Sequence, residues 1–238
     1  MSSKSIKTSF GLSPLFIVVL ALLTAIAPLA TDMYLAALPA VAENLNTTST
    51  NASLTLSGFM VGMALGQLVV GPLSDKTGRR KPLLFGVVIC FIATVACGFA
   101  PNIELLIFAR FMMGFAGSIG AVLARSIVAD TTQGLATAKL MGVMMMINGF
   151  APVLAPLFGG WVLSWGNWRD IFHVLSVITA VMMLGVIFVI KETLPVEERY
   201  QGTALSVYSE LPKVFKIRRY LGFMLTMCFA FGALFSYI

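Results

Sequence analysis

Long apolar segments separated by short polar ones run along the whole chain. A helix that crosses a bilayer needs about 20 predominantly apolar residues. The segments that approach or reach this length are 15–38, 52–73, 83–100, 105–128, 140–163, 171–190 and 221–238. The first is too long for the apolar part of a signal peptide and contains Asp32, so we interpret it as a retained span. The pattern predicts an all-α membrane protein, with a six-helix bundle and the start of a seventh span.

The basic residues lie on alternate sides of these spans. Every lysine and arginine except Arg110 and Arg169 lies before the first span, after the sixth, or in or beside the connections on that same side. The connections 39–51 and 101–104 contain none. Because lysine and arginine are retained in the cytoplasm, we expect a cytoplasmic N-terminus and a cytoplasmic segment after the sixth span.

The composition excludes several classes of protein. Hydrophobic residues make up 58% of the chain and charged residues 11%, whereas soluble domains have about 45–50% and about 25%. This argues against a soluble enzyme, a nucleic-acid binder and a disordered chain. The net charge of +6 is explained by its sided distribution and needs no nucleic acid. No segment matches the nucleotide-binding loop G-x-x-x-x-G-K-[ST], and a single histidine with three scattered cysteines predicts no metal and no cofactor.

Polar composition divides the chain into three parts. Residues 1–190 contain the six spans, residues 191–220 form the only long polar connection, and residues 221–238 begin a seventh apolar segment. We expect a six-span bundle, a cytoplasmic linker and the start of span 7. Because the chain ends within that last segment, we expect it to be part of a longer protein.

The turn between the second and third spans has the most specific pattern in the chain. Residues 71–80 read GPLSDKTGRR. The pair Gly71–Pro72 is expected to end the second span, and Gly78 permits a tight turn. The charged residues of this turn could meet acids, a helix end or lipid phosphates, although a plain positively charged loop is the simpler alternative.

The full spacing of this turn resembles the loop signature G-x-L-x-D-x-x-G-R-[RK] of the major facilitator superfamily. The matching positions are Gly71, Leu73, Asp75, Gly78, Arg79 and Arg80. The resemblance implies a major facilitator fold, of which these spans would form the N-terminal six-helix bundle. It also implies a conformational switch loop, in which Asp75 and Arg79 form a charge network with Asp130 from the turn after the fourth span.

Further stretches resemble the 12-span drug/proton antiporters. Residues 28–39 and 123–130 are similar to the bicyclomycin/chloramphenicol resistance branch, and residues 109–114 resemble the motif R-x-x-Q-G, with Met113 in place of glutamine. This resemblance implies transport across a bacterial cytoplasmic membrane.

The fifth span resembles the antiporter signature G-x-x-x-G-P-x-x-G-G, with Ala155 in place of the glycine before the proline. The positions that it marks for antiporter-type helix packing are Gly149, Pro152, Pro156, Gly159 and Gly160. Small residues also allow close helix approach in any membrane bundle, so this stretch indicates packing or gating and no contact with substrate.

Two charges lie inside spans. Asp32 and Arg110 are each about 8–9 Å below the outer face, at about 1.5 Å per helical residue. Ionisable residues within membrane helices are costly and mark functional sites by default. Equal depth predicts that the two lie together, and we expect them to couple transport to protons; a purely structural ion pair is the alternative.

The predicted function is proton-coupled export of drug-like small amphipathic compounds. The predicted partners are that substrate, protons, the lipid bilayer and a C-terminal six-span half, with no nucleic acid and no nucleotide. Two alternatives stay open at this point: uptake of a metabolite by proton symport, and a six-span chain that transports nothing and acts only as an interaction partner or is a remnant. No catalytic residues are expected, because the chain offers no Ser/His/Asp or Cys/His set.

Overall fold

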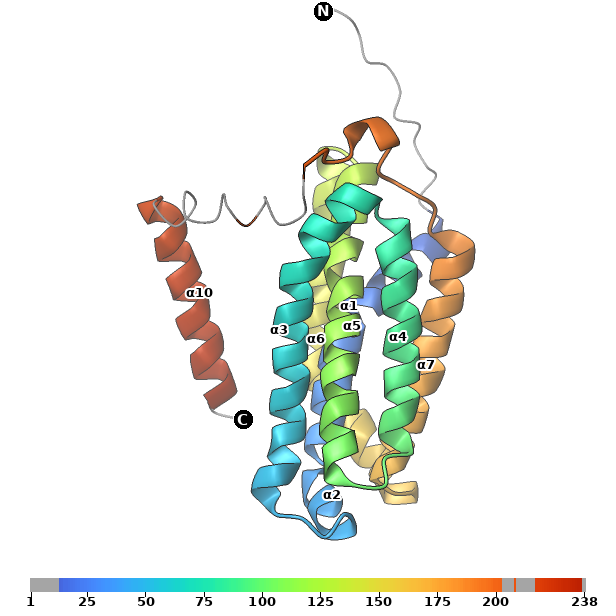
Figure 1. Ribbon diagram of the computed structural model, residues 1–238, viewed down its shortest axis with the longest axis vertical. Helices are drawn as coiled ribbons and strands as arrows, with labels where there is room; N and C mark the ends of the chain where they lie inside the picture. Colours follow the sequence, from blue (N-terminus) through green and yellow to red (C-terminus); the bar gives the residue numbers. More distant parts are fainter. Residues whose placement is uncertain (1–12, 203–207, 209–216, 237–238) are drawn as a thin grey trace, which may run out of the picture. The chain divides into compact units, whose positions relative to one another are not determined.

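The computed structural model describes residues 13–202, 208 and 217–236, and in these residues it contains helices and no β-strand. Six long helices run up and down in one bundle (Figure 1): α1 (Pro14–Leu35), α3 (Ser49–Thr77), α4 (Arg80–Gly98), α5 (Ile103–Thr131), α6 (Leu135–Trp165) and α7 (Trp168–Val189). A short helix, α2 (Leu38–Asn44), precedes α3, and a 3-10 turn, η1 (Val196–Glu198), follows α7. All six long helices are long and apolar enough to cross a membrane. The prediction of an all-α membrane protein with a six-helix bundle is confirmed.

The second span is longer than its sequence predicts. Helix α3 continues through Gly71 and Pro72 and ends at Thr77, so the expectation that this pair ends the span is wrong. A proline inside a helix removes one backbone donor and crowds one carbonyl, a local loss that membrane helices tolerate. The turn between the second and third spans therefore begins at Gly78, about two helical turns after Gly71.

The chain divides into two units, Met1–Arg199 and Tyr200–Ile238. Residues 191–199 belong to the first unit, so its boundary lies nine residues beyond the predicted end of the six-span part at 190. The second unit contains helix α10 (Arg218–Ser236), where the seventh span was predicted. Residues 1–12, 203–207, 209–216 and 237–238 lie outside the described residues; they include Lys4, Lys7 and the middle part of the predicted linker.

Helix α5 lies against α1, α3, α4 and α6 and forms the centre of the first unit. Glycines bring α3 and α5 into backbone contact. A Cβ atom at Gly62 would run into the carbonyl oxygen of Phe111, and one at Gly114 would run into that of Phe59. Only a hydrogen atom fits at these positions, which explains the close approach of the two helices.

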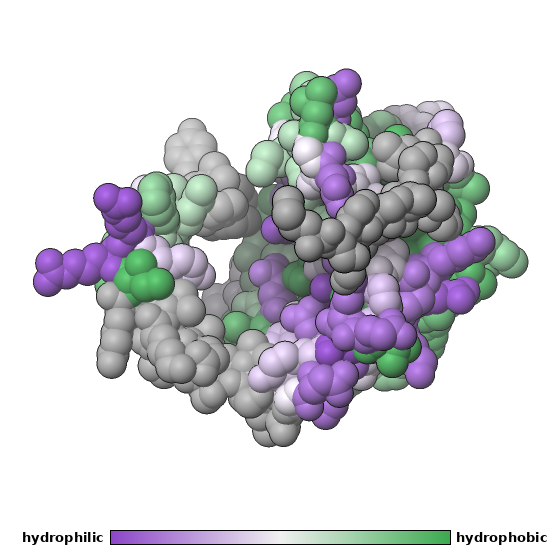
Figure 2. All heavy atoms as spheres, turned by 90° about the horizontal axis from the view of Figure 1, so that it is seen from above, coloured by the Kyte–Doolittle hydropathy of each residue, from purple (hydrophilic) through white to green (hydrophobic). Residues whose placement is uncertain are grey.

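The outer faces of α3 and α6 are apolar and exposed in the isolated chain. Examples are Val61 and Leu68 on α3 and Phe150, Leu157 and Trp161 on α6. Apolar side chains all round a helix suit a membrane interior. By contrast, hydrophilic side chains gather over the end of the bundle where α3 meets α4, which Figure 2 shows from above.

The opposite end of the bundle is closed by α2 and the start of α7. The side-chain oxygen Oδ1 of Asn44 accepts hydrogen bonds from Trp168 Nε1 at 3.3 Å and Arg169 Nη1 at 2.6 Å. Arg169 Nη2 also donates to the carbonyl of Ala100 at 3.1 Å. Arg169, the basic residue on the sparsely charged side of the bundle, therefore joins three connections.

Candidate functional site

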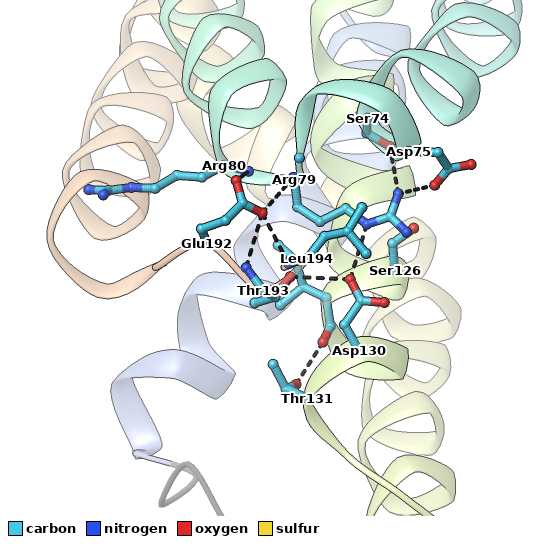
Figure 3. Close-up of polar contacts among 12 residues, drawn as sticks. Ser74, Asp75, Arg79, Arg80, Ser126, Asp130, Thr131, Glu192, Thr193 and Leu194 are labelled. Carbon is cyan, nitrogen blue, oxygen red and sulfur yellow. Dashed lines mark hydrogen bonds and ion pairs between the residues drawn. The ribbon is translucent and has the colours of Figure 1, made fainter. Parts of the chain in front are cut away.

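Arg79 lies at the turn between α3 and α4 and connects the ends of α3 and α5 (Figure 3). Its Nε donates to Oδ2 of Asp130 at 3.0 Å. Its Nη1 donates to the carboxylate of Asp75 and to the hydroxyl of Ser74, the latter at 2.7 Å. We call these four residues the Arg79 network. The structure thus brings Asp130, which lies 51 residues further along the chain than Arg79, together with Asp75 and Arg79.

Burial within the Arg79 network is uneven. The side chains of Arg79 and Asp130 are 11% and 18% exposed, whereas that of Asp75 is 47% exposed. Burial by itself lowers the pKa of Arg79, but the hydrogen bonds and charges of Asp130 and Asp75 outweigh it and raise the pKa above its usual value. The guanidinium therefore stays cationic, and Asp130 is its more strongly desolvated partner.

The other residues of the turn have different surroundings. Gly78 has φ +90°, which favours glycine, as the sequence predicts. Gly71 lies within α3 with no atom near enough to contact an added Cβ. Arg80 is not part of the Arg79 network: its Nη2 donates to the carbonyl of Ile187 at the end of α7, at 3.2 Å. The side chain of Arg79 therefore contacts α3 and α5, whereas that of Arg80 contacts α7.

Sequence reasoning missed two residues that complete this site, Glu192 and Thr193. The Glu192 carboxylate accepts hydrogen bonds from the backbone N–H groups of Arg79 at 2.8 Å and Arg80 at 3.3 Å. Thr193 Oγ1 donates to Oδ2 of Asp130 at 3.2 Å. Burial raises the pKa of Glu192, but its backbone hydrogen bonds and the nearby Arg199 outweigh this and lower it. The only sequence signal was an acid placed directly after the sixth span.

Arg110 lies fully buried in the centre of the bundle. Its Nη1 donates to the carbonyl of Ala30 on α1 at 2.8 Å. Its guanidinium carbon lies 4.5 Å from the ring centroid of Tyr34 and 4.7 Å from that of Phe59, and aromatic faces at this distance attract a cation. Its Nε and Nη2 are buried without a hydrogen-bond partner among the described residues.

Asp32 is also buried, at 8% exposure, but no ion pair joins it to Arg110. The direct pairing that equal depth predicts is therefore absent from this structure. Depth gives only the height of a residue in the membrane. Asp32 lies two residues beyond Ala30, or about 200° around the helix at 3.6 residues per turn, while α1 presents the Ala30 carbonyl to Arg110.

These two residues still form an unusual arrangement on neighbouring helices. A buried donor without a partner costs about 1–3 kcal/mol, and more when it is charged. Two nitrogens of one guanidinium edge can hold a carboxylate in a bidentate manner, and Nε and Nη2 of Arg110 are the nitrogens left over. Arg110 is thus a buried cation that can bind an anionic partner through Nε and Nη2. Asp32, an acid that can bind a proton, lies two residues after Ala30, whose carbonyl Arg110 now contacts.

The residues marked for packing in the fifth span have different surroundings. A Cβ atom at Gly159 would run into the backbone oxygen of Met33 on α1, whereas Gly149 and Gly160 have no atom near enough for contact. Pro152 and Pro156 both lie inside α6. Among the described residues, only Gly159 of these three glycines is required for close packing of α6 on α1.

Replacing Gly159 by alanine is expected to destabilise the bundle, because the added methyl group forces α6 away from α1. Overpacking of this kind costs about 1–3 kcal/mol. Gly160→Ala is the matched control, since its methyl group enters open space. Thermal unfolding in detergent, followed by intrinsic tryptophan fluorescence, should show a lower midpoint for Gly159→Ala alone; equal midpoints would contradict the assigned contact.

Comparison with known proteins places these features in a family. The Major Facilitator Superfamily profile matches residues 20–238. Over 92% of its own length, the chain is 38% identical to the MFS-type transporter YdgK of Bacillus subtilis. Over 94% of its own length, it is 29% identical to the bicyclomycin resistance protein homolog of Haemophilus influenzae. It is 31% identical to the multidrug resistance protein MdtL of Citrobacter koseri over 71% of its length.

These matches cover 55%, 56% and 43% of the respective relatives, so the chain spans about half the length of the curated proteins that it matches. Among solved structures, the human organic anion transporter MFSD10 (TETRAN) has the same fold, with a TM-score of 0.63 and 19% identity over 79% of this chain and 50% of that one. These relatives agree with the resemblance to the drug/proton antiporter branch that the sequence motifs indicate. The chain is a multi-pass integral membrane protein that belongs to the Major Facilitator Superfamily, and its six-helix bundle is the N-terminal half of that fold.

Proposed function

We propose that this chain forms the N-terminal half of a secondary transporter that exports drug-like, small amphipathic compounds in exchange for protons. The observation that carries the proposal is the Arg79 network, a set of charged hydrogen bonds that ties the ends of α3 and α5 together. Relatives named for multidrug resistance and bicyclomycin resistance support export of drugs as the direction of transport.

In this proposal the Arg79 network is the gate at the cytoplasmic end of the bundle. Its hydrogen bonds hold the helix ends together while the protein is open to the outside. Each bond to a charged group contributes about 1.5–3 kcal/mol, so breaking the network shifts the balance between outward-open and inward-open states by tenfold or more. The prediction that residues 71–80 form a conformational switch loop is retained here as a proposal.

Asp32 and Arg110 are proposed to couple transport to protons. Proton binding at Asp32 removes a buried negative charge, and release of the proton restores it. Substrate that favours one charge state of this site then becomes linked to the proton by a reciprocal free energy. Arg110 supplies the cation that responds to this change, through Nε and Nη2, which have no hydrogen-bond partner in the described part of the chain.

The proposed location is the bacterial cytoplasmic membrane, with the N-terminus and the Arg79 network on the cytoplasmic side. The support is the sided distribution of lysine and arginine in the sequence. A C-terminal six-span half, joined to this chain or bound to it, is proposed to complete the transport pathway. The exposed apolar faces of α3 and α6 are compatible with a further helical partner or with lipid.

Cysteine labelling is expected to reveal this orientation. A cysteine at Asn46, between α2 and α3, should react with a membrane-impermeant maleimide in intact cells; one at Glu197, in η1, should react only after permeabilisation. The background should lack the native Cys90, Cys97 and Cys228. The opposite pattern of labelling would refute the proposed topology, since both sites are on connections and not within spans.

Accumulation of drugs in whole cells tests the direction of transport. Cells that express the complete transport unit, this chain together with a C-terminal half, should accumulate less ethidium than cells with the Arg110→Ala variant, and an uncoupler should abolish the difference. Higher accumulation of a metabolite would indicate proton symport. Equal accumulation of every compound, with normal membrane insertion, would indicate a chain that transports nothing.

A further inference from the structure

Residues 190–199, which we call the strap, follow α7 and contact the start of α4 and the end of α5. Figure 3 shows Glu192 and Thr193 of the strap beside Arg79 and Asp130. Two side chains anchor the strap in the bundle: Ile190 is 1% exposed and Leu194 is 8% exposed. Glu192 and Thr193 lie between these two anchors in the sequence, and their polar side chains contact residues of the Arg79 network. The function proposed above assigns no role to either of them.

Glu192 acts as a cap for α4. The first N–H groups of a helix have no partner within the helix and lie at the positive end of its dipole, so a carboxylate there is stabilising. Arg79, the N-cap residue of α4, provides no side-chain cap of its own. Glu192 supplies it from the strap: Oε1 accepts from Arg79 N at 2.8 Å, and Oε2 accepts from Arg80 N at 3.3 Å.

The same carboxylate also shapes the strap. Glu192 Oε1 accepts hydrogen bonds from the backbone N–H groups of Thr193 and Leu194, each at 3.1 Å. Arg199 Nη2 lies 3.7 Å from Glu192 Oε2. One side chain therefore holds both the strap in its folded course and the start of α4.

Thr193 provides a second connection to the gate. Its Oγ1 donates to Oδ2 of Asp130 at 3.2 Å, and this is the oxygen that accepts from Arg79 Nε at 3.0 Å. The strap therefore contacts Arg79 from two directions: Glu192 holds its backbone, and Thr193 shares the carboxylate oxygen that holds its side chain.

Gly78 provides the space that the strap needs. A Cβ atom at Gly78 would run into Oε2 of Glu192 and would lie 2.8 Å from Nη2 of Arg199. Two features of the structure thus require glycine at position 78: its positive φ and the close approach of the strap. The turn and the strap are built to contact each other.

We propose that Glu192 and Thr193 are positioning residues of the gate, and that the Arg79 network can open only when the strap lifts from α4 and α5. This inference rests on the gating role proposed for the network. The chain continues from Arg199 into the second unit, so the strap is the covalent path by which a displacement of that unit reaches the gate. The strap would then link the state of one half of the transporter to the other.

Hydrogen exchange of the 238-residue chain in nanodiscs tests the first step. In Glu192→Ala, the backbone amides of Arg79 and Arg80 should exchange faster by on the order of tenfold, because they lose a charged acceptor. Glu197→Ala is the matched control: it removes the same charge from η1, and Glu197 has no hydrogen bond or ion pair to any described residue. Unchanged exchange in Glu192→Ala, or equal acceleration in the control, would overturn the proposal.

A double-mutant cycle tests whether the strap and the gate act together. Glu192→Ala should lower the thermal midpoint by less in an Asp130→Asn background than in the parent chain, because residues of one network do not contribute additively. A cap that merely stabilised α4 would give the same decrease in both backgrounds, and this additivity would overturn the proposal. If Glu192→Ala does not fold, Glu192→Gln and Thr193→Val are used in the same cycle with the same two readings.

Neither experiment measures transport, so the two proposals can fail separately. A non-additive cycle together with a complete transport unit that exports nothing would retain the strap as part of the network and would reject the proposed export. An additive cycle with normal export would reject the strap and retain the exporter.

Discussion

Asp32→Asn is expected to reduce proton-driven export to the level of vesicles that lack the protein. The asparagine amide has nearly the shape of the carboxyl group but cannot bind and release a proton. Asp32 is buried in the last turns of α1, where its charge is costly. If Asp32 is the group that binds and releases the exchanged proton, its replacement alone is enough to uncouple export from the proton gradient. Substrate binding to the same variant is expected to persist.

The measurement uses everted membrane vesicles with an imposed pH gradient and a fluorescent substrate, with the complete transport unit. Glu43→Gln is the matched control, because it neutralises an exposed acid on the neighbouring helix α2. Arg110→Lys should impair export as well: lysine keeps the charge but loses the planar fork and its stacking between Tyr34 and Phe59. Wild-type, gradient-dependent export by Asp32→Asn would make Asp32 structural and place the coupling group elsewhere.

Disruption of the Arg79 network is expected to have the second largest effect, and its members should rank by burial. Asp130→Asn removes the charge of the carboxylate that is 18% exposed and serves both Arg79 and Thr193. The loss of a charged hydrogen bond there is about 1.5–3 kcal/mol. Asp75→Asn should impair export less, because that carboxylate is 47% exposed and water screens it.

Arg79→Lys should resemble Asp130→Asn in this series, since a single ammonium group cannot reach Asp130, Asp75 and Ser74 with the geometry of a guanidinium. Lys76→Gln is the control, because it removes an exposed positive charge from the end of α3. Rates of export should be compared at equal amounts of inserted protein. Wild-type rates in both Asp130→Asn and Arg79→Lys would show that the turn serves only to orient the protein in the membrane.

Much of the architecture was predictable because the relevant physics is local. A run of about 20 apolar residues has few stable alternatives to a membrane helix, so the six spans followed from hydropathy. The positive φ of Gly78 followed from the chemistry of a tight turn. The helix boundaries were predicted less well: Pro72 is by itself a signal for the end of a helix, but α3 continues past it to Thr77.

The contacts between distant residues could not be predicted in the same way. Equal depth placed Asp32 and Arg110 at one level, yet the helices turn Arg110 toward the Ala30 carbonyl and two aromatic rings. Adjacent glycines at 159 and 160 are equivalent in sequence, and only Gly159 faces α1.

The sequence by itself determined the class of the protein, the number of spans in the first unit, and the family to which its charged turn belongs. Hydropathy and turn chemistry are properties of short segments, so they can be read without knowledge of neighbours. Only the tertiary structure decided which face each helix presents, that Arg110 has no acidic partner among the residues that the structure describes, and that Glu192 caps a helix that begins far from it in sequence. The rotation of a helix about its axis and the course of a connecting segment depend on packing against all the other helices at once, and no short segment contains that information.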